Sequence, residues 1–294
     1  MLEILSGLDM QSVAYGWIAD ACDDVKSFPD GTVRGVIRGG SSEMPLAVVS
    51  HYDRPRFRLA SDFEGGWVKL APVGEVRAQT YMNCAVVSAS GVKGFIGKHG
   101  DDAAAYVGDV EEGRLRIGET LYVYVEPAVL ADGTVCSPFC SCAAPAYALA
   151  SAARRLAEDA PERDVYFILT AEGQYDFKQY FSAVSECGAA YAVCVGSVDE
   201  KETGGGGAFA RLCDRSFSSD GELSALLTAA GATPLVLSEG SCAASGVQRN
   251  GIPAAQLDVP VRLLGTAREC VRTEDVGAVA DVIVKLCGSF GAGK

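Results

Sequence analysis

Five short apolar runs, each ending in polar or turn residues, constrain this chain more than any other feature of its sequence. The first is LAVVSHYD at residues 46–53, and the other four follow after residue 163. Runs of this length and composition are typical of buried strands. Helical patterns separate them, and strands that alternate with helices favour a parallel sheet covered by helices on both faces. The sequence therefore predicts an α/β fold with a mostly parallel central sheet. The later runs are DVYFILTAE, AAYAVCVGS, TPLVLSEG and QLDVPVRL, and the helical segments are residues 143–156, 179–187, 220–230 and 274–287.

Residues from about 55 to 130 interrupt this pattern. Helical periodicity is lost there, and short β-rich runs such as WVKLAPV, CAVVSAS and TLYVYVEPAVL take its place, with turn residues between them. Several short strands with such punctuation are typical of a small barrel or sandwich. We therefore predict a main α/β domain at residues 1–54 and 131–294, with a small β-barrel domain inserted at 55–130.

The charge of the chain excludes some partners. Its 294 residues carry 25 Lys and Arg against 38 Asp and Glu, a formal net charge of −13. This argues against nucleic acid and against anionic membrane surfaces as partners. The sequence contains no apolar run of membrane-spanning length. We also expect no signal peptide in MLEILSGLDM, so the eleven cysteines are expected to be reduced thiols in a cytoplasmic protein.

The run LAVVSHYD carries the first candidate functional residues. His51, one of two histidines, stands at the expected carboxyl end of a strand, and Asp53 follows two residues later. Ligand sites of open α/β sheets form at that edge. A carboxylate beside an imidazole commonly fixes its tautomer for metal binding, although a surface histidine would explain the same spacing. A second candidate is the cluster CSPFCSC at residues 136–142, whose spacing does not fit a zinc ribbon.

The order of motifs resembles a known family, the dinuclear-zinc aminopeptidases of the glutamyl and deblocking type. Its members assemble into tetrahedral particles, and some were labelled endoglucanase or cellulase M. SHYD resembles the family's strand that ends in His-x-Asp, and WVKLAPVGEV resembles its strand followed by Pro-x-Gly-Gly. GVKGFIGKHG resembles a Gly-x-x-Gly-x-Ile-Gly run that leads to a His. NGIPAAQLDVPVRLLGTARE resembles Gly-Ile-Pro, a strand, Pro-x-Arg-Tyr, a ligand His and a later Glu. The resemblance implies a zinc-exopeptidase-like fold with an inserted barrel and a homo-oligomer.

The same resemblance implies that most of the catalytic residues are substituted, so the chain looks like a degenerate member. His51 keeps the place of the first metal ligand and Asp53 that of its orienting partner. Cys140 takes the place of the bridging Asp, Ala171 that of the general base, and Glu172 keeps a ligand place. Loss of a general base alone reduces a rate by about 10²–10⁴.

In the same comparison with the family, glycines occupy ligand places of the second metal. The Asp after the third strand falls at Gly196, with Asp199 three residues late, and the last ligand His falls at Gly265. Glycine supplies no side-chain donor, so dinuclear hydrolysis is not expected.

Three functions remain open. The first is a non-catalytic scaffold or peptide-binding protein, which assembles with itself or with a paralogue. The second is a hydrolase with a rearranged single-metal site that holds zinc or another divalent metal through His51, Cys140 and Glu172, with Asp199 or Asp176 as a further donor. The third is cysteine nucleophilic catalysis by Cys140 with His51 as its base.

Overall fold

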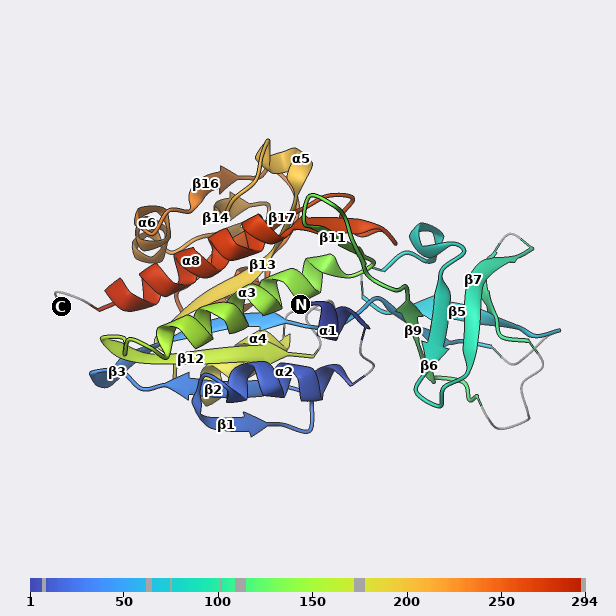
Figure 1. Cartoon of the computed structure of the whole chain (residues 1–294), viewed down its shortest axis with the longest axis horizontal. Coiled ribbons are helices and arrows are strands. Elements are labelled where there is room, and N and C mark those ends of the chain that lie inside the picture. Colours follow the sequence, from blue (N-terminus) through green and yellow to red (C-terminus); the bar gives the residue numbers. More distant parts are fainter. Residues whose placement is uncertain are drawn as a thin grey trace.

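The computed structural model describes residues 1–6, 9–61, 65–74, 76–100, 102–108, 115–171 and 178–291. A large sheet of nine described strands forms the main part of the molecule, in the order β1-β2-β12-β3-β13-β17-β14-β15, with β16 beside β14 (Figure 1). Its strands are β1 (Asp23–Ser27), β2 (Val33–Ile37), β3 (Ser41–His51), β12 (Arg163–Thr170), β13 (Tyr191–Asp199), β14 (Phe209–Asp214), β15 (Phe217–Ser218), β16 (Thr233–Val236) and β17 (Ala254–Val261).

Helices cover both faces of this sheet. α2 packs on β2, while α3 and α8 lie against each other and against the central strands. On the opposite face, α4 contacts β3 and β12, and α7 contacts β13 and β17. The helices are α1 (Leu2–Ser6), α2 (Met10–Ala19), α3 (Cys140–Leu156), α4 (Lys178–Glu186), α5 (Glu200–Thr203), α6 (Gly221–Ala229), α7 (Ala243–Gln248) and α8 (Thr273–Ser289), with a 3₁₀ turn, η1 (Ala78–Tyr81).

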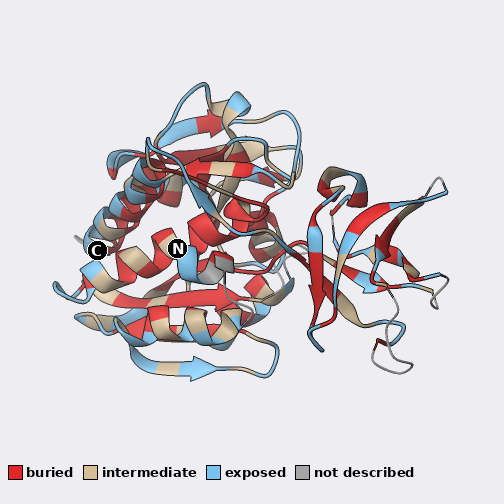
Figure 2. Cartoon of the chain, turned by 45° about the vertical axis from the view of Figure 1, so that its right-hand side comes forward, coloured by how far each residue is buried: buried red, intermediate tan, exposed pale blue. Residues whose placement is uncertain are grey.

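The side chains of β3 point alternately to the two faces of the sheet, and both faces are buried. Leu46 and Val48 point into the core beneath α3, whereas Ala47 and Val49 point into the core beneath α4 and α7. Successive strand residues face opposite sides of a sheet, so a strand covered on both faces needs a continuous apolar run. Figure 2 shows the central strands and the inner faces of the helices as buried.

A second group of strands lies beside the main sheet, at the right of Figure 1. Six strands close into a barrel in the order β4-β5-β8-β7-β6-β9, around a core that includes Phe57, Ile96 and Leu121. These strands are β4 (Arg56–Leu59), β5 (Trp67–Pro72), β6 (Ala85–Ser88), β7 (Lys93–His99), β8 (Asp102–Tyr106) and β9 (Thr120–Tyr124).

A small three-stranded sheet lies where the chain returns from the barrel. It consists of β10 (Ala128–Val129), β11 (Thr134–Ser137) and β18 (Glu269–Arg272). β11 runs directly into α3, and β18 runs directly into α8. This sheet therefore fixes the start of both long helices that cover the central strands.

The central sheet is mixed, which corrects the expectation of a mostly parallel sheet. β12, β3, β13 and β17 pair in parallel, but β2 pairs antiparallel with β12, and β14 pairs antiparallel with β17. The antiparallel edge begins with a β1–β2 hairpin across the Phe28–Gly31 turn. In the described residues, no helix is long and apolar enough to cross a membrane.

Because the central strands are buried on both faces, a buried and an exposed valine of the same sheet can be compared for their effect on stability. Val259 in β17 is fully buried, whereas Val236 in β16 is 66% exposed. We predict that Val259→Ala lowers the free energy of unfolding by about 2 kcal/mol, because two buried methyl groups are lost and a cavity is left. Val236→Ala should change it by less than about 0.5 kcal/mol. Urea denaturation of both variants measures the difference, and equal midpoints would contradict this account of the core.

Candidate functional site

The candidate site is a cavity at the carboxyl end of β3. Its volume is about 290 Å³. Because β3 pairs in parallel with β12 and β13, the ends of these strands meet at one edge, where loops and helix starts supply side chains. The residues that line the cavity are His51, Val76, Tyr81, Ser141, Cys142, Tyr180, Gly196, Ser197, Arg211, Ser241, Cys242, Ala243, Gln256, Leu264, Gly265 and Glu269.

His51 is held by Asp53, as the spacing in the sequence predicts for an orienting carboxylate. The ring Nδ1 of His51 pairs with Oδ1 of Asp53, and both side chains are largely buried, at 13% and 2% exposure. An ionised carboxylate only accepts, so Nδ1 carries the hydrogen. Burial lowers the pKa of His51, but the charges of Cys142 and Asp53 raise it by more, to well above its ordinary value. Asp53 thus fixes one ring nitrogen and leaves Nε2 for other contacts.

The cysteine beside His51 is Cys142, not the Cys140 of the motif alignment. One donor atom each of His51, Asp53 and Cys142 lie within 4.8 Å of one another. Cys140 is fully buried, and its thiol donates to the carbonyl of Val135 in β11 at 3.5 Å. Both cysteines lie in the first turn of α3, two residues apart, and such residues point to different sides of a helix. A metal role for Cys140 stays a prediction.

Glu269 forms the wall opposite β3. Its carboxylate accepts hydrogen bonds from the Ser141 amide (2.8 Å), the Ser141 hydroxyl (3.0 Å) and the Gly265 amide (2.8 Å). Burial raises its pKa from 4.5 to about 7, and these hydrogen bonds limit the rise. Glu269 therefore satisfies a free amide in the first turn of α3 and holds that turn against β18.

A buried cation occupies another wall. Arg211 of β14 pairs with Asp258 of β17 through Nη2 at 2.7 Å and with Asp214 through Nη1 at 3.1 Å. All three side chains are buried. Burial lowers the pKa of Arg211, but the two carboxylates raise it by more, so the guanidinium stays charged. The amide of Gln256 donates to the other oxygen of Asp258 at 2.8 Å, which completes the cluster.

Gly196 and Gly265, which the motif alignment assigns to lost ligands of the second metal, both line this cavity. A Cβ atom at Gly196 would lie 2.5 Å from Nε2 of Gln256 and 3.2 Å from Oδ1 of Asp258. Gln256 is itself 2% exposed and hydrogen-bonded, so it has little freedom to move. The volume that a side chain at Gly196 would need is filled by the Arg211 cluster.

The comparisons with known proteins concern the fold. No protein-family model and no curated protein matches the sequence. The structure is similar to a TET aminopeptidase from a marine sediment archaeon of the Thaumarchaeota, with a TM-score of 0.89, 15% identity, and coverage of 99% of this chain and 95% of that chain. An aminopeptidase from the archaeon Desulfurococcus kamchatkensis gives a TM-score of 0.84 at 18% identity, covering 94% and 88% of the two chains. TET1 peptidase of Pyrococcus horikoshii gives 0.82 at 18% identity, covering 95% and 93%.

This chain has the fold of the TET aminopeptidases. The resemblance drawn from the sequence motifs is thereby confirmed at the level of the fold, across nearly the whole chain. The identities are too low for the comparisons to carry activity over, so the chemistry depends on the side chains themselves.

A dinuclear metal centre does not fit these side chains. Gly196 and Gly265 offer no side-chain donor, and the guanidinium of Arg211 lines the same small cavity. Gln256 and Asp258 fill the space beside Gly196 in which a ligand side chain for a second metal would have to lie. Together, His51, Asp53 and Cys142 offer three donor atoms for at most one ion.

Asp199 lies outside this cavity. Asp199 caps the start of α5 and pairs with Lys201 at 3.0 Å, and it lines a separate groove together with Arg262. Ala171 lies at the end of β12 and packs against the main core. Glu172 and Asp176 fall outside the described residues. Sequence reasoning did not select Arg211 or Cys142 as site residues, because only the fold places them beside His51.

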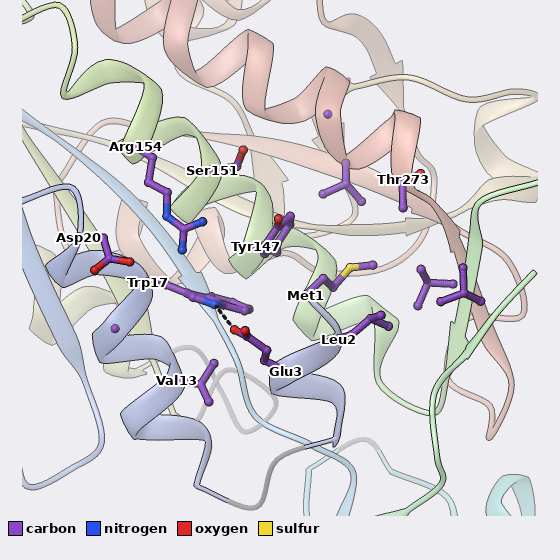
Figure 3. Close-up of a pocket in the computed structure, with 15 residues that line it drawn as sticks. Met1, Leu2, Glu3, Val13, Trp17, Asp20, Tyr147, Ser151, Arg154 and Thr273 are labelled. Atoms are coloured by element: carbon purple, nitrogen blue, oxygen red, sulfur yellow. Dashed lines mark hydrogen bonds between the residues drawn. The ribbon is translucent and has the colours of Figure 1, made fainter.

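A groove larger than this cavity lies elsewhere in the described part of the chain. It has a volume of about 1080 Å³ and runs between α1, α2, α3 and α8, where Trp17 and Tyr147 pack edge to face (Figure 3). Its polar residues include Glu3, which accepts a hydrogen bond from the Trp17 indole at 3.5 Å, and Arg154. It contains no histidine or cysteine among its described lining residues, so we place the chemistry at the smaller cavity.

The close packing at Gly196 predicts a clear effect of one methyl group. Gly196→Ala should lower the free energy of unfolding by about 1–3 kcal/mol, because the new Cβ displaces the buried Gln256 amide. Gly205→Ala is the matched control: Gly205 has no atom within 4 Å of a built Cβ. This control should be neutral or stabilise by up to about 1 kcal/mol. Thermal or urea unfolding compares the two, and a tolerated Gly196→Ala would show that the cavity has room for a ligand side chain.

The raised pKa of Glu269 predicts a pH dependence of stability. The folded state retains this proton up to about pH 7, whereas the unfolded state loses it near pH 4.5, so stability falls as pH rises through that window. The full effect is about 3 kcal/mol. Glu269→Gln removes this titration, so the difference in unfolding free energy between the wild type and Glu269→Gln should shrink from pH 4.5 to 7. Parallel stability curves for the two proteins would contradict the assignment.

Proposed function

We propose that this protein is a TET-fold homologue of metal aminopeptidases that does not carry out two-metal hydrolysis and instead binds a peptide in the cavity at His51. The observation that supports this most is the Arg211 cluster. It places the guanidinium of Arg211 in the lining of the cavity, held by two buried carboxylates, where Gly196 leaves no room for a ligand side chain. Asp214 and Asp258 are thus already paired with a cation of the protein itself.

The chemistry of the cavity suits the end of a peptide. A volume of about 290 Å³ is at the lower limit of small-ligand pockets and accommodates about one residue. Tyr81 and Tyr180 provide aromatic surface, while His51 and Glu269 provide hydrogen-bonding groups. Such a mixture of apolar walls and a few fixed polar groups is typical of binding sites.

We further propose that the protein functions as a homo-oligomer or together with a paralogue. The P. horikoshii TET1 peptidase assembles into a tetrahedron or an octahedral shell, and its fold covers 95% of this chain. Residues 55–130, which include the closed barrel, are proposed as the domain that contributes to this assembly.

A second candidate function is hydrolysis at a single metal ion. The geometry that favours it is the convergence of His51, Asp53 and Cys142. Imidazole nitrogen and thiolate sulfur are suitable ligands for Zn²⁺, which would supply Lewis acidity there. Because Asp53 already holds Nδ1 of His51, it would orient the imidazole, and Nε2 and the Cys142 sulfur would remain as protein donors.

One experiment separates these functions. Protein purified without chelator or affinity-tag metal is analysed for bound metal, assayed with aminoacyl anilides in added Zn²⁺ or Co²⁺, and titrated calorimetrically with tripeptides that differ in their first residue. We expect peptide binding without turnover, weakened at least about tenfold by His51→Ala. His99→Ala is the matched control, because His99 is exposed on the barrel and stacks on Trp67.

Each result assigns the site differently. Two metals per chain with turnover would overturn the proposal. One metal that is lost in both His51→Ala and Cys142→Ala, together with turnover, would establish the single-metal hydrolase instead. Absence of peptide binding and of turnover would leave only the assembly role, which sedimentation velocity measures directly.

A further inference from the structure

Two cysteines outside the cavity face each other across the small sheet. Cys136 of β11 and Cys270 of β18 are direct antiparallel partners, and their sulfur atoms lie 2.6 Å apart. This is closer than two unbonded thiols normally pack. The two residues are 134 positions apart in the chain, so the fold and not local sequence brings them together.

The backbone geometry of this pair is suitable for a disulfide. The amide and carbonyl of Cys270 both bond to Arg262 on the other side of β18, at 3.0 and 2.9 Å. Cys136 and Cys270 are therefore a non-hydrogen-bonded pair, in which opposing Cα atoms are about 4.5 Å apart and the side chains are closest. That separation lies within the range spanned by protein disulfides, so a bond requires little movement of the backbone.

The pair is also accessible, unlike most cysteines of the chain. Cys136 and Cys270 are both half-buried, whereas Cys84, Cys140, Cys142, Cys194, Cys242 and Cys287 are buried. Cys270 lines an open groove of about 780 Å³ between β17, α5 and the loop before β11. A small reagent can enter there without opening the core.

We propose that Cys136 and Cys270 form a redox-active dithiol that a small disulfide, of the class of oxidised glutathione, converts into an intramolecular disulfide. One protein thiolate attacks a sulfur of the small disulfide, forms a mixed disulfide and releases one small thiolate. The second protein thiolate then attacks the protein sulfur of the mixed disulfide. This step forms the Cys136–Cys270 bond and releases the second small thiolate. The protein loses two electrons and two protons, and the small disulfide is reduced to two thiols.

The two thiols do not ionise together. Burial, the hydrogen bond to Cys136 and the charge of Cys136 raise the pKa of Cys270 to about 12. While one sulfur is a thiolate, the other therefore keeps its proton, and it acts second, as the resolving thiol. Once the Cys136 sulfur is capped, it no longer carries the charge that opposes ionisation of Cys270.

The bond would join two elements that build the cavity. β11 leads into the first turn of α3 with Ser141 and Cys142, and Cys270 directly follows Glu269, which holds Ser141. The inference goes beyond the proposed peptide binding and does not depend on it, since it needs only the two thiols and the sheet.

The test is thiol chemistry on the full-length protein. Reduced protein is incubated with oxidised glutathione in excess, quenched with an alkylating reagent under denaturing conditions, and analysed by intact mass and by peptide mapping without reductant. We expect two fewer alkyl groups per chain than in reduced protein alkylated under the same denaturing conditions, and a single linked pair of peptides that contain Cys136 and Cys270. The melting temperature should rise by about 5–10 °C, because the bond closes a long loop.

Variants that lack one cysteine test whether the bond forms between Cys136 and Cys270. Cys270→Ser should trap a stable mixed disulfide with glutathione on Cys136, with no internal bond. Cys213→Ser is the matched control, since Cys213 is also a half-buried strand cysteine, and it should form the bond as the wild type does. The proposal is overturned if both thiols of the folded wild type remain unmodified, if a different pair is linked, or if Cys270→Ser still forms an internal disulfide.

Discussion

The register of β3 between β12 and β13 is the constraint on which the site depends. Thr170 of β12 pairs with His51, and Cys194 of β13 pairs with Val49, so β3 and β12 end together while β13 continues to Asp199. A shift of one residue would exchange the two faces of β3 and turn Leu46 and Val48 away from α3. It would also turn His51 away from Cys142. Burial of an apolar strand on both faces therefore fixes the position of the imidazole.

The Arg211 cluster, more than Gly196 and Gly265, supports the proposal that this cavity holds no second metal. A missing donor can be replaced by water, but a guanidinium held by Asp214 and Asp258 is a fixed positive charge. Removing one partner of such a buried group generally destabilises a protein by about 3–5 kcal/mol, because the other is left uncompensated. The cluster is complete as it stands, with Gln256 on the remaining oxygen of Asp258. The guanidinium of Arg211 is thus a covalently attached cation in the lining of the cavity.

The fold was more predictable from the sequence than the site. The apolar runs at β3, β12, β13, β16 and β17 were found because burial leaves a continuous signal in composition. β14 was missed, since FARLCD is short and follows a run of glycines, and Arg211 was missed with it. The antiparallel pairings of β2 with β12 and of β14 with β17 were not predicted, because pairing direction leaves no such signal.

The residues around His51 were also harder to predict from the sequence than the strands. The helix of residues 143–156 was expected to start three residues later than α3 does, at Cys140. With the first turn known, Cys140 and Cys142 point to different sides, and only Cys142 reaches His51. A comparison of sequence motifs does not show which side of the helix each cysteine faces. The pairing of Asp53 with His51, in contrast, was predictable, because it depends on a spacing of two residues at a strand end.

β18 carries one residue of the proposed binding cavity and one residue of the proposed dithiol, next to each other in the chain. Neighbouring residues of a strand face opposite sides, so Glu269 faces the cavity while Cys270 faces Cys136 and the open groove. A bond at Cys270 therefore leaves the cavity itself unobstructed and acts only on the position of the strand that holds Ser141. Linkage makes any such effect reciprocal. If the Cys136–Cys270 disulfide changes the affinity of the cavity for a ligand by some factor, then binding of that ligand changes the equilibrium constant for forming the disulfide by the same factor.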